Sequence, residues 1–257
     1  MCKEEGERNI RLLVSYDGTD FSGWQRQGDA QNPRTVQGTL EKALSVIHKG
    51  QVNLTGSGRT DTGVHAAAQT ANFITNIRGM EAERFVPALN SLLPRDVRIL
   101  EAKETRRDFH ARFDARLRTY RYYFITCREA LPWELRYAWH LRRQPDLRRL
   151  NEYARLFRGE MDCTSFAVPG DKSKSRCRYI FGASFFIEGS RLIFEISANA
   201  FLWKMVRSIT GTLLRCEEKG LDADFVAGII QSRNQALAGP IAPARGLFLW
   251  KIDYYRE

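Results

Sequence analysis

Two apolar segments, residues 178–188 and 191–198, are separated by only Gly189-Ser190. A two-residue connection joins neighbouring antiparallel strands, and glycine in its first position favours a type II′ turn. Parallel strands need a crossover of a dozen or more residues. A purely parallel sheet is therefore excluded for this part of the chain.

The rest of the sequence alternates between short β-rich segments and amphipathic helical ones. We predict further strands at residues 11–16, 52–55, 69–74, 97–104, 117–126 and 246–252. We predict helices at residues 36–48, 82–93, 147–158, 201–218 and 222–232. Thr35 and Asp146 stand at N-cap positions, and Gly50 and Gly159 follow the ends of the same two helices. The pattern predicts an α+β fold with antiparallel or mixed sheets and helices packed on one side.

Length and composition limit the class of protein. A chain of 257 residues is long enough for two domains. It contains no apolar run of the roughly 18 residues that a membrane span needs, and its N-terminus lacks the apolar region of a secretory signal. Five scattered cysteines without a CxxC pair and four distant histidines argue against a disulfide framework or a metal site. We expect a cytoplasmic protein without a metal.

The charge points to a partner. The formal net charge is +10, and residues 103–158 hold 15 basic and 7 acidic residues, a net +8. Aromatic residues such as Phe113, Tyr120 and Tyr122 are interleaved with these arginines. A concentrated, arginine-rich excess with aromatic neighbours favours nucleic acid as the partner.

The segment Gly56-Ser57-Gly58-Arg59-Thr60-Asp61-Thr62-Gly63-Val64-His65-Ala66 resembles a phosphate-binding loop but lacks its Lys-Ser/Thr pair. It also fails as a dinucleotide fingerprint, because Asp61 takes the place of the third glycine. What remains is Arg59 and Asp61 on a loop whose glycines let a bulky ligand approach the backbone. A tight connection in which Asp61 caps a turn is the structural alternative.

That segment also resembles the motif of the tRNA pseudouridine synthase A family. Other motifs follow in the family's order along residues 10–252. They include Phe21-Ser22-Gly23-Trp24-Gln25, Asp108-Phe109-His110-Ala111-Arg112-Phe113, Arg118-Thr119-Tyr120-Arg121-Tyr122, Met205-Val206-Arg207 and Ala242-Pro243-Ala244-Arg245-Gly246. Each motif is weak alone, but together they are highly specific.

The resemblance implies a fold and an activity. The fold would be two similar halves, residues 1–113 and 114–257, each with its own sheet and helices and with the active-site cleft between them. The activity would be isomerisation of uridine to pseudouridine at positions 38–40 in the anticodon stem-loop of tRNA. The family is homodimeric and uses no cofactor, so tRNA and a second copy of the chain are the expected partners.

The resemblance also assigns roles to residues. Asp61 would be the catalytic carboxylate, which either attacks C1′ of the ribose or removes the 2′ proton. Tyr120 would stack on the target uracil, Arg207 would pair with Asp61, and Arg59 would support the flipped nucleotide. The expected RNA-binding residues are His110, Arg112, Arg116, Arg118, Arg142 and Arg143. Two alternatives remain: an RNA-binding protein without catalysis, and a nuclease or N-glycosidase that acts on RNA.

Overall fold

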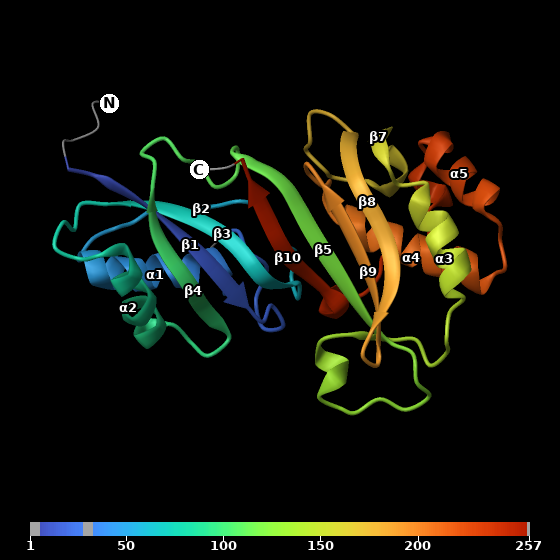
Figure 1. Ribbon diagram of the computed structural model, residues 1–257, viewed down its shortest axis with the longest axis horizontal. Helices are drawn as coiled ribbons and strands as arrows, with labels where there is room; N and C mark the ends of the chain where they lie inside the picture. Colours follow the sequence, from blue (N-terminus) through green and yellow to red (C-terminus); the bar gives the residue numbers. More distant parts are fainter. Residues whose placement is uncertain (1–5, 28–32, 256–257) are drawn as a thin grey trace. The chain divides into compact units, whose positions relative to one another are not determined.

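The computed structural model describes residues 6–27 and 33–255 (Figure 1). The chain forms two compact units, the first of Met1–Arg116 with Leu249–Glu257 and the second of Leu117–Phe248. The chain therefore leaves the first unit once and returns to it with its last strand. Each unit combines paired strands with helices, which confirms the predicted α+β class.

The first unit is built on strands in the order β4-β1-β3-β10, with the short β2 also paired to β3. Its strands are β1 (Arg8–Tyr16), β2 (Thr55–Gly56), β3 (His65–Thr75), β4 (Val97–Thr105) and β10 (Leu247–Tyr254). Its helices are α1 (Val36–His48) and α2 (Phe85–Leu92). Because β1 pairs antiparallel with both β3 and β4, it lies at the centre of this part of the sheet.

One face of this sheet is apolar. Ile10 of β1 is fully buried and lies opposite Phe73 of β3. The Phe73 ring meets Phe85 of α2 edge-on, with the centroids 5.3 Å apart. His48, at the end of α1, stacks on the same Phe85 ring at 6.0 Å. Both helices therefore cover the same face, as predicted for an α+β unit.

Local sequence signals predict α1 correctly, but they predict the strand and the helix that follow it only in part. Thr35 caps the predicted helix, since its side chain accepts a hydrogen bond from Gly38 N at 3.3 Å. The predicted strand 52–55 is mostly wrong, because only Thr55–Gly56 pairs with β3. The predicted helix 82–93 starts as a 3₁₀ turn, Ala82–Arg84, before α2 begins.

The second unit carries strands in the order β5-β9-β8-β7, with the short β6 parallel to β5. Its strands are β5 (Ala115–Ile125), β6 (Trp139–His140), β7 (Gly159–Asp162), β8 (Cys177–Glu188) and β9 (Arg191–Ala198). Its helices are α3 (Leu147–Arg155), α4 (Met205–Glu218) and α5 (Ala223–Ser232), and α3 contacts both of the others (Figure 1).

The predicted hairpin is confirmed. Glu188 pairs with Arg191, and of the two turn residues only Gly189 has a positive φ, at 60°. That pattern belongs to a type II′ turn and not to a type I′ turn, which needs positive φ at both positions. The hairpin places Phe185 against Phe194, with ring centroids 4.5 Å apart in the core of the unit.

Other boundaries in this unit differ from the prediction. The helix predicted at 201–218 begins only at Met205, because Lys204 adopts a left-handed conformation with φ at 58°. The helix predicted at 147–158 ends at Arg155, although Asp146 caps it as expected. Strands β6 and β7 were not predicted, since two and four residues are too few to show a periodicity.

Candidate active site

Asp61 lies in a tight turn between β2 and β3 of the first unit. Its carbonyl accepts a hydrogen bond from Val64 N at 3.1 Å, and Gly63 between them has φ at 75°. Type II turns need a positive φ at this position and favour glycine there. Asp61 is half-buried, while Val64 behind it is buried in the core. The backbone that carries the Asp61 carboxylate is therefore held in a defined turn.

The segment from Tyr16 to Trp24 lies against this turn. The Tyr16 hydroxyl is 2.8 Å from Thr60 Oγ1, and Trp24 N donates to the Thr60 carbonyl at 3.1 Å. Gly23 has φ at 91°, and a Cβ at this position would lie 2.6 Å from Thr60 O. The backbone conformation and the close approach both require glycine. Two motifs far apart in sequence thus form one local structure.

The other side of the Asp61 loop is held by Gln69, which is fully buried in β3. Ser57 Oγ donates to Gln69 Oε1 at 2.5 Å, and Gln69 Nε2 donates to the Gly58 carbonyl at 2.9 Å. Gln69 was not predicted from the sequence, because a buried amide beside a loop leaves no local signal. Arg59 is exposed, and its Nε donates to Gln25 Oε1 at 3.2 Å.

Tyr120 belongs to β5 of the second unit. It is 9% exposed, lies opposite Ile196 of β9, and meets the Phe201 ring edge-on at 5.1 Å. Tyr122 follows on the same face of the strand and packs on Phe124, with ring centroids 4.8 Å apart. Alternation along β5 therefore places Tyr120, Tyr122 and Phe124 on one face of the strand.

Arg207 lies in the first turn of α4 and is half-buried. Its Nε donates to the Ala242 carbonyl at 2.7 Å, and the neighbouring Pro243 carbonyl accepts from the Tyr122 hydroxyl at 2.6 Å. Burial raises the pKa of the Tyr122 phenol far above its usual range, although the cations of Arg207 and Arg245 oppose the shift. Tyr122 therefore remains a protonated donor. Tyr122 and Arg207 thus both bind the backbone of the segment Ala242-Pro243 in the second unit.

The predicted RNA-binding arginines lie in different surroundings. Arg142 is exposed, and its own φ is 58°. Arg116 is also exposed, with its Cζ 5.4 Å from the Tyr255 ring centroid. In the second unit, Arg118 Nη1 donates to the Asn199 carbonyl at 2.6 Å. Arg143 Nη2 lies 2.6 Å from Oε2 of the buried Glu217. Arg118 and Arg143 therefore support the fold of their unit.

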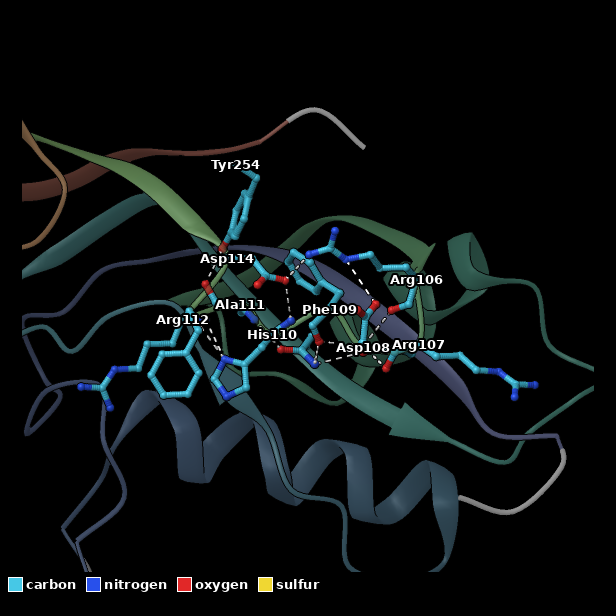
Figure 2. Close-up of polar contacts among 12 residues, drawn as sticks. Arg106, Arg107, Asp108, Phe109, His110, Ala111, Arg112, Asp114 and Tyr254 are labelled. Carbon is cyan, nitrogen blue, oxygen red and sulfur yellow. Dashed lines mark hydrogen bonds and ion pairs between the residues drawn. The ribbon is translucent and has the colours of Figure 1, made fainter. Parts of the chain in front are cut away.

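His110 and Arg112 belong to the loop of residues 106–114, which is drawn in Figure 2. Asn9 Nδ2 donates to the Phe109 carbonyl at 2.9 Å. Asn72 Oδ1 accepts from Ala111 N at 2.9 Å, and the Tyr254 hydroxyl donates to the Ala111 carbonyl at 2.8 Å. Side chains of β1, β3 and β10 therefore fix the backbone of this loop.

Asp114 closes the same loop. Its Oδ2 accepts from His110 N at 3.0 Å and from Arg106 Nη2 at 2.6 Å. These two hydrogen bonds, the one from His110 first, hold the pKa of the Asp114 carboxyl below its usual range. Figure 2 shows the Arg112 guanidinium pointing away from these anchoring groups. The loop thus has a fixed base and an outward-facing cation.

Residues 6–27 and 33–255 contain neither a metal-binding cluster nor a membrane-spanning helix. No group of three or more His, Cys, Asp or Glu side chains there is arranged to hold a metal ion. None of the helices described for these residues is long and apolar enough to cross a membrane.

Comparison with known proteins supports the family resemblance that the sequence motifs indicate. A family model described as tRNA pseudouridine synthase matches residues 12–114 and 153–255. A Treponema denticola protein named tRNA pseudouridine synthase A is 53% identical over 252 residues, which cover 97% of this chain and 94% of that protein. The chain belongs to the tRNA pseudouridine synthase family. Proteins of the same name from Treponema pallidum (strain Nichols) and Acetivibrio thermocellus are 50% and 39% identical over 235 and 247 residues. These matches cover 91% and 96% of this chain, and 84% and 100% of the relatives.

Membership of the tRNA pseudouridine synthase family also explains the architecture. The family model matches twice, once from β1 to Asp114 and once from α3 to β10, which supports the prediction of two similar halves. Asp61, Arg59, His110, Arg112 and Arg116 belong to the first unit. Tyr120, Arg207, Arg118, Arg142 and Arg143 belong to the second.

Proposed function

We propose that this protein isomerises uridine to pseudouridine at positions 38–40 in the anticodon stem-loop of tRNA. The observation that carries the proposal is Asp61, which the ordered turn of the family motif presents half-buried beside exposed Arg59. In the reaction the C1′–N1 bond of uridine breaks and a C1′–C5 bond forms. The proton on C5 is lost and N1 gains one, so the product has the same atoms as the substrate.

Asp61 is the proposed catalytic residue. A carboxylate suits a sugar centre that develops positive charge, because it attacks C1′ or stabilises that charge. Removal of the 2′ proton by the same carboxylate is the other route, and both remain open. Tyr120 is proposed to stack on the uracil and to help remove the C5 proton. Its ring is already oriented by Phe201. Arg207 is proposed to bind the reacting nucleotide.

The remaining residues are proposed to hold the RNA. A base inside a stem must be flipped out before it reacts, at a cost of a few kcal/mol. Arg59, which is exposed on the Asp61 loop, is proposed to support the flipped nucleotide. The net +8 of residues 103–158 supplies the attraction to phosphates, with His110, Arg112, Arg116, Arg118, Arg142 and Arg143 as the proposed contacts.

The proposal extends to assembly, cofactors and location. We expect a homodimer in which one tRNA contacts both copies, and we expect the enzyme in the cytoplasm, where tRNA is modified. An isomerisation conserves every atom and electron, so it needs no redox partner or nucleotide. Pure protein treated with a chelator is expected to modify tRNA at an undiminished rate. Activity that zinc alone restores would contradict this.

The direct test is chemical mapping of pseudouridine in unmodified tRNA incubated with the pure protein. Pseudouridine is expected at one or more of positions 38–40, with RNA length and mass unchanged. The control is Asp61→Asn, which keeps the shape of the side chain but removes its charge and nucleophilicity. It should bind tRNA within a few-fold of wild type and form no pseudouridine. Cleaved RNA, abasic sites or binding without product would each overturn the proposed function.

A further inference from the structure

Phe113 is an unusually exposed aromatic residue near the end of the 106–114 loop. It is 75% exposed, the largest value among the exposed large hydrophobic residues that the structure describes. The His110 ring lies beside it, with centroids 4.3 Å apart and planes inclined by 31°. The Arg112 Cζ lies 5.7 Å from the Phe113 centroid. Phe113, His110 and Arg112 therefore bring together an aromatic face, an imidazole and a cation.

The position of the ring is fixed by the loop that carries it. Both Arg112 N and Phe113 N donate to His110 Nδ1, at 3.2 and 3.3 Å. These bonds fix the imidazole ring relative to the backbone of Phe113. Asn9, Asn72 and Tyr254 fix the same loop from beneath, as described above. An aromatic side chain on a pre-ordered loop loses little conformational entropy when it binds a flat partner.

The charge around the ring indicates the kind of partner. Residues 106–116 hold four arginines and two aspartates, a net +2. Protein interfaces are built on clustered apolar residues with few charges at their core, whereas Phe113 stands among charged neighbours. A stacking ring beside a cation, such as Phe113 beside Arg112, is typical of sites that bind unpaired nucleotides, where the bases stack and the phosphates meet the positive charge.

We infer that Phe113, supported by His110 and Arg112, is a stacking site for an unpaired nucleobase of the bound tRNA. The inference rests on the proposed function and adds to it a second contact, separate from the proposed uracil contact of Tyr120. Stacking on an aromatic face tolerates any base, so this contact strengthens binding without selecting a sequence. A contact of this kind serves an enzyme that acts at any of the proposed positions 38–40, because it does not depend on the identity of the neighbouring base.

The test measures the dissociation constant of an anticodon stem-loop RNA by fluorescence anisotropy. All variants carry Asp61→Asn, so that the substrate is not converted. Phe113→Ala is expected to weaken binding about five- to hundredfold. Phe113→Tyr and Phe113→Trp should stay within about threefold of the parent, whereas Phe113→Leu should resemble Phe113→Ala. The salt dependence of Phe113→Ala should match the parent, because no phosphate contact is lost.

Phe225 provides a matched control. It is also an exposed phenylalanine, 51% exposed, but it follows Asp222 and Asp224 on α5 and so lacks the positive surroundings. Phe225→Ala should bind RNA like the parent. Thermal melts of all variants show whether any loss of affinity comes from unfolding, which is not expected for side chains this exposed.

Three outcomes would overturn the inference. Unchanged affinity of Phe113→Ala, or full affinity of Phe113→Leu, would show that no stacking contact exists. A change from dimer to monomer in sedimentation, with RNA affinity unchanged, would assign Phe113 to contact with a second copy. The proposed function is tested separately by pseudouridine formation with Asp61 intact. Wild-type turnover together with unchanged Phe113→Ala binding would reject this inference alone.

Discussion

Arg142 and Arg143 are neighbours in sequence, yet the structure gives them different surroundings. Arg142 is exposed. Arg143 pairs with Glu217, whose other carboxylate oxygen accepts from Asp146 N at 2.8 Å, at the N-cap of α3. The Glu217 side chain is 8% exposed and that of Arg143 32%. Arginine-rich sequence alone does not show which of its cations also pairs with a buried carboxylate.

This difference predicts that two adjacent substitutions change the free energy of unfolding by different amounts. Arg143→Ala leaves the Glu217 carboxylate buried without this cation, so the free energy of unfolding should fall by about 2 kcal/mol, less than for a fully buried pair. Arg142→Ala should leave stability within about 0.5 kcal/mol and weaken tRNA binding. Denaturant unfolding and RNA titration of both variants provide the check. A stable Arg143→Ala variant would show that the ion pair contributes nothing.

Gly23 and Gly58 offer a second comparison between single residues. Gly23→Ala forces a side chain into the left-handed region and places its Cβ against the Thr60 carbonyl. A cost of about 2 kcal/mol or more is expected. At Gly58 a Cβ would meet nothing within 4 Å and no positive φ applies, so Gly58→Ala should fold normally. Thermal melts of the two variants measure the contrast, and equal melting temperatures would contradict it.

At the scale of elements, the 106–114 loop depends on the ionised form of Asp114. Its folded-state pKa is lowered, so its contribution to stability is full above its unfolded pKa of about 3.9 and is lost as the pH falls through the folded value. Asp114→Asn should be less stable than wild type by up to about 1 kcal/mol at pH 6. The difference should vanish well below pH 4. Unfolding curves between pH 3 and 7 test this, and a constant difference would exclude ionisation of the Asp114 carboxyl as its cause.

Elements with strong local signals were predictable. Thr35 and Asp146 mark the starts of α1 and α3 because capping is a contact within one turn. The start of α4 was not predictable, since no local pattern indicates that Lys204 adopts a left-handed conformation. The three residues Val52–Leu54 look β-rich, but pairing with β3 begins only at Thr55. Pairing depends on residues distant in sequence, which single segments do not report.

Some residues of the candidate site were likewise predictable from local sequence, and others were not. Arg59 and Asp61 were found because the motif that holds them is contiguous. Gln69, the Pro243 carbonyl and Asn72 were missed, although they hold the Asp61 loop, Tyr122 and the 106–114 loop in place. Such supports act through side chains or carbonyl groups brought close only by folding. Sequence thus indicates which groups react, and the fold is needed to find what positions them.

At the scale of the whole molecule, the net charge of +10 predicts steep salt dependence. Each phosphate neutralised by the protein should add about 0.7–0.9 to the slope of log affinity against log salt concentration. With several arginines in contact, the slope should have a magnitude of at least about 3. Titrations of tRNA between low and moderate salt measure it. A nearly flat dependence would contradict an electrostatic interface.

The position of β10 at the end of the chain also has a consequence during synthesis of the protein. A ribosome completes residues 117–248 before it adds the part of β10 that belongs to the first unit. Until then β3 lacks the β10 partner along one edge. Exposed edges invite pairing with other chains. The unit that is synthesised first is therefore finished last, and until β10 is made its sheet presents an edge that can pair with strands of other chains.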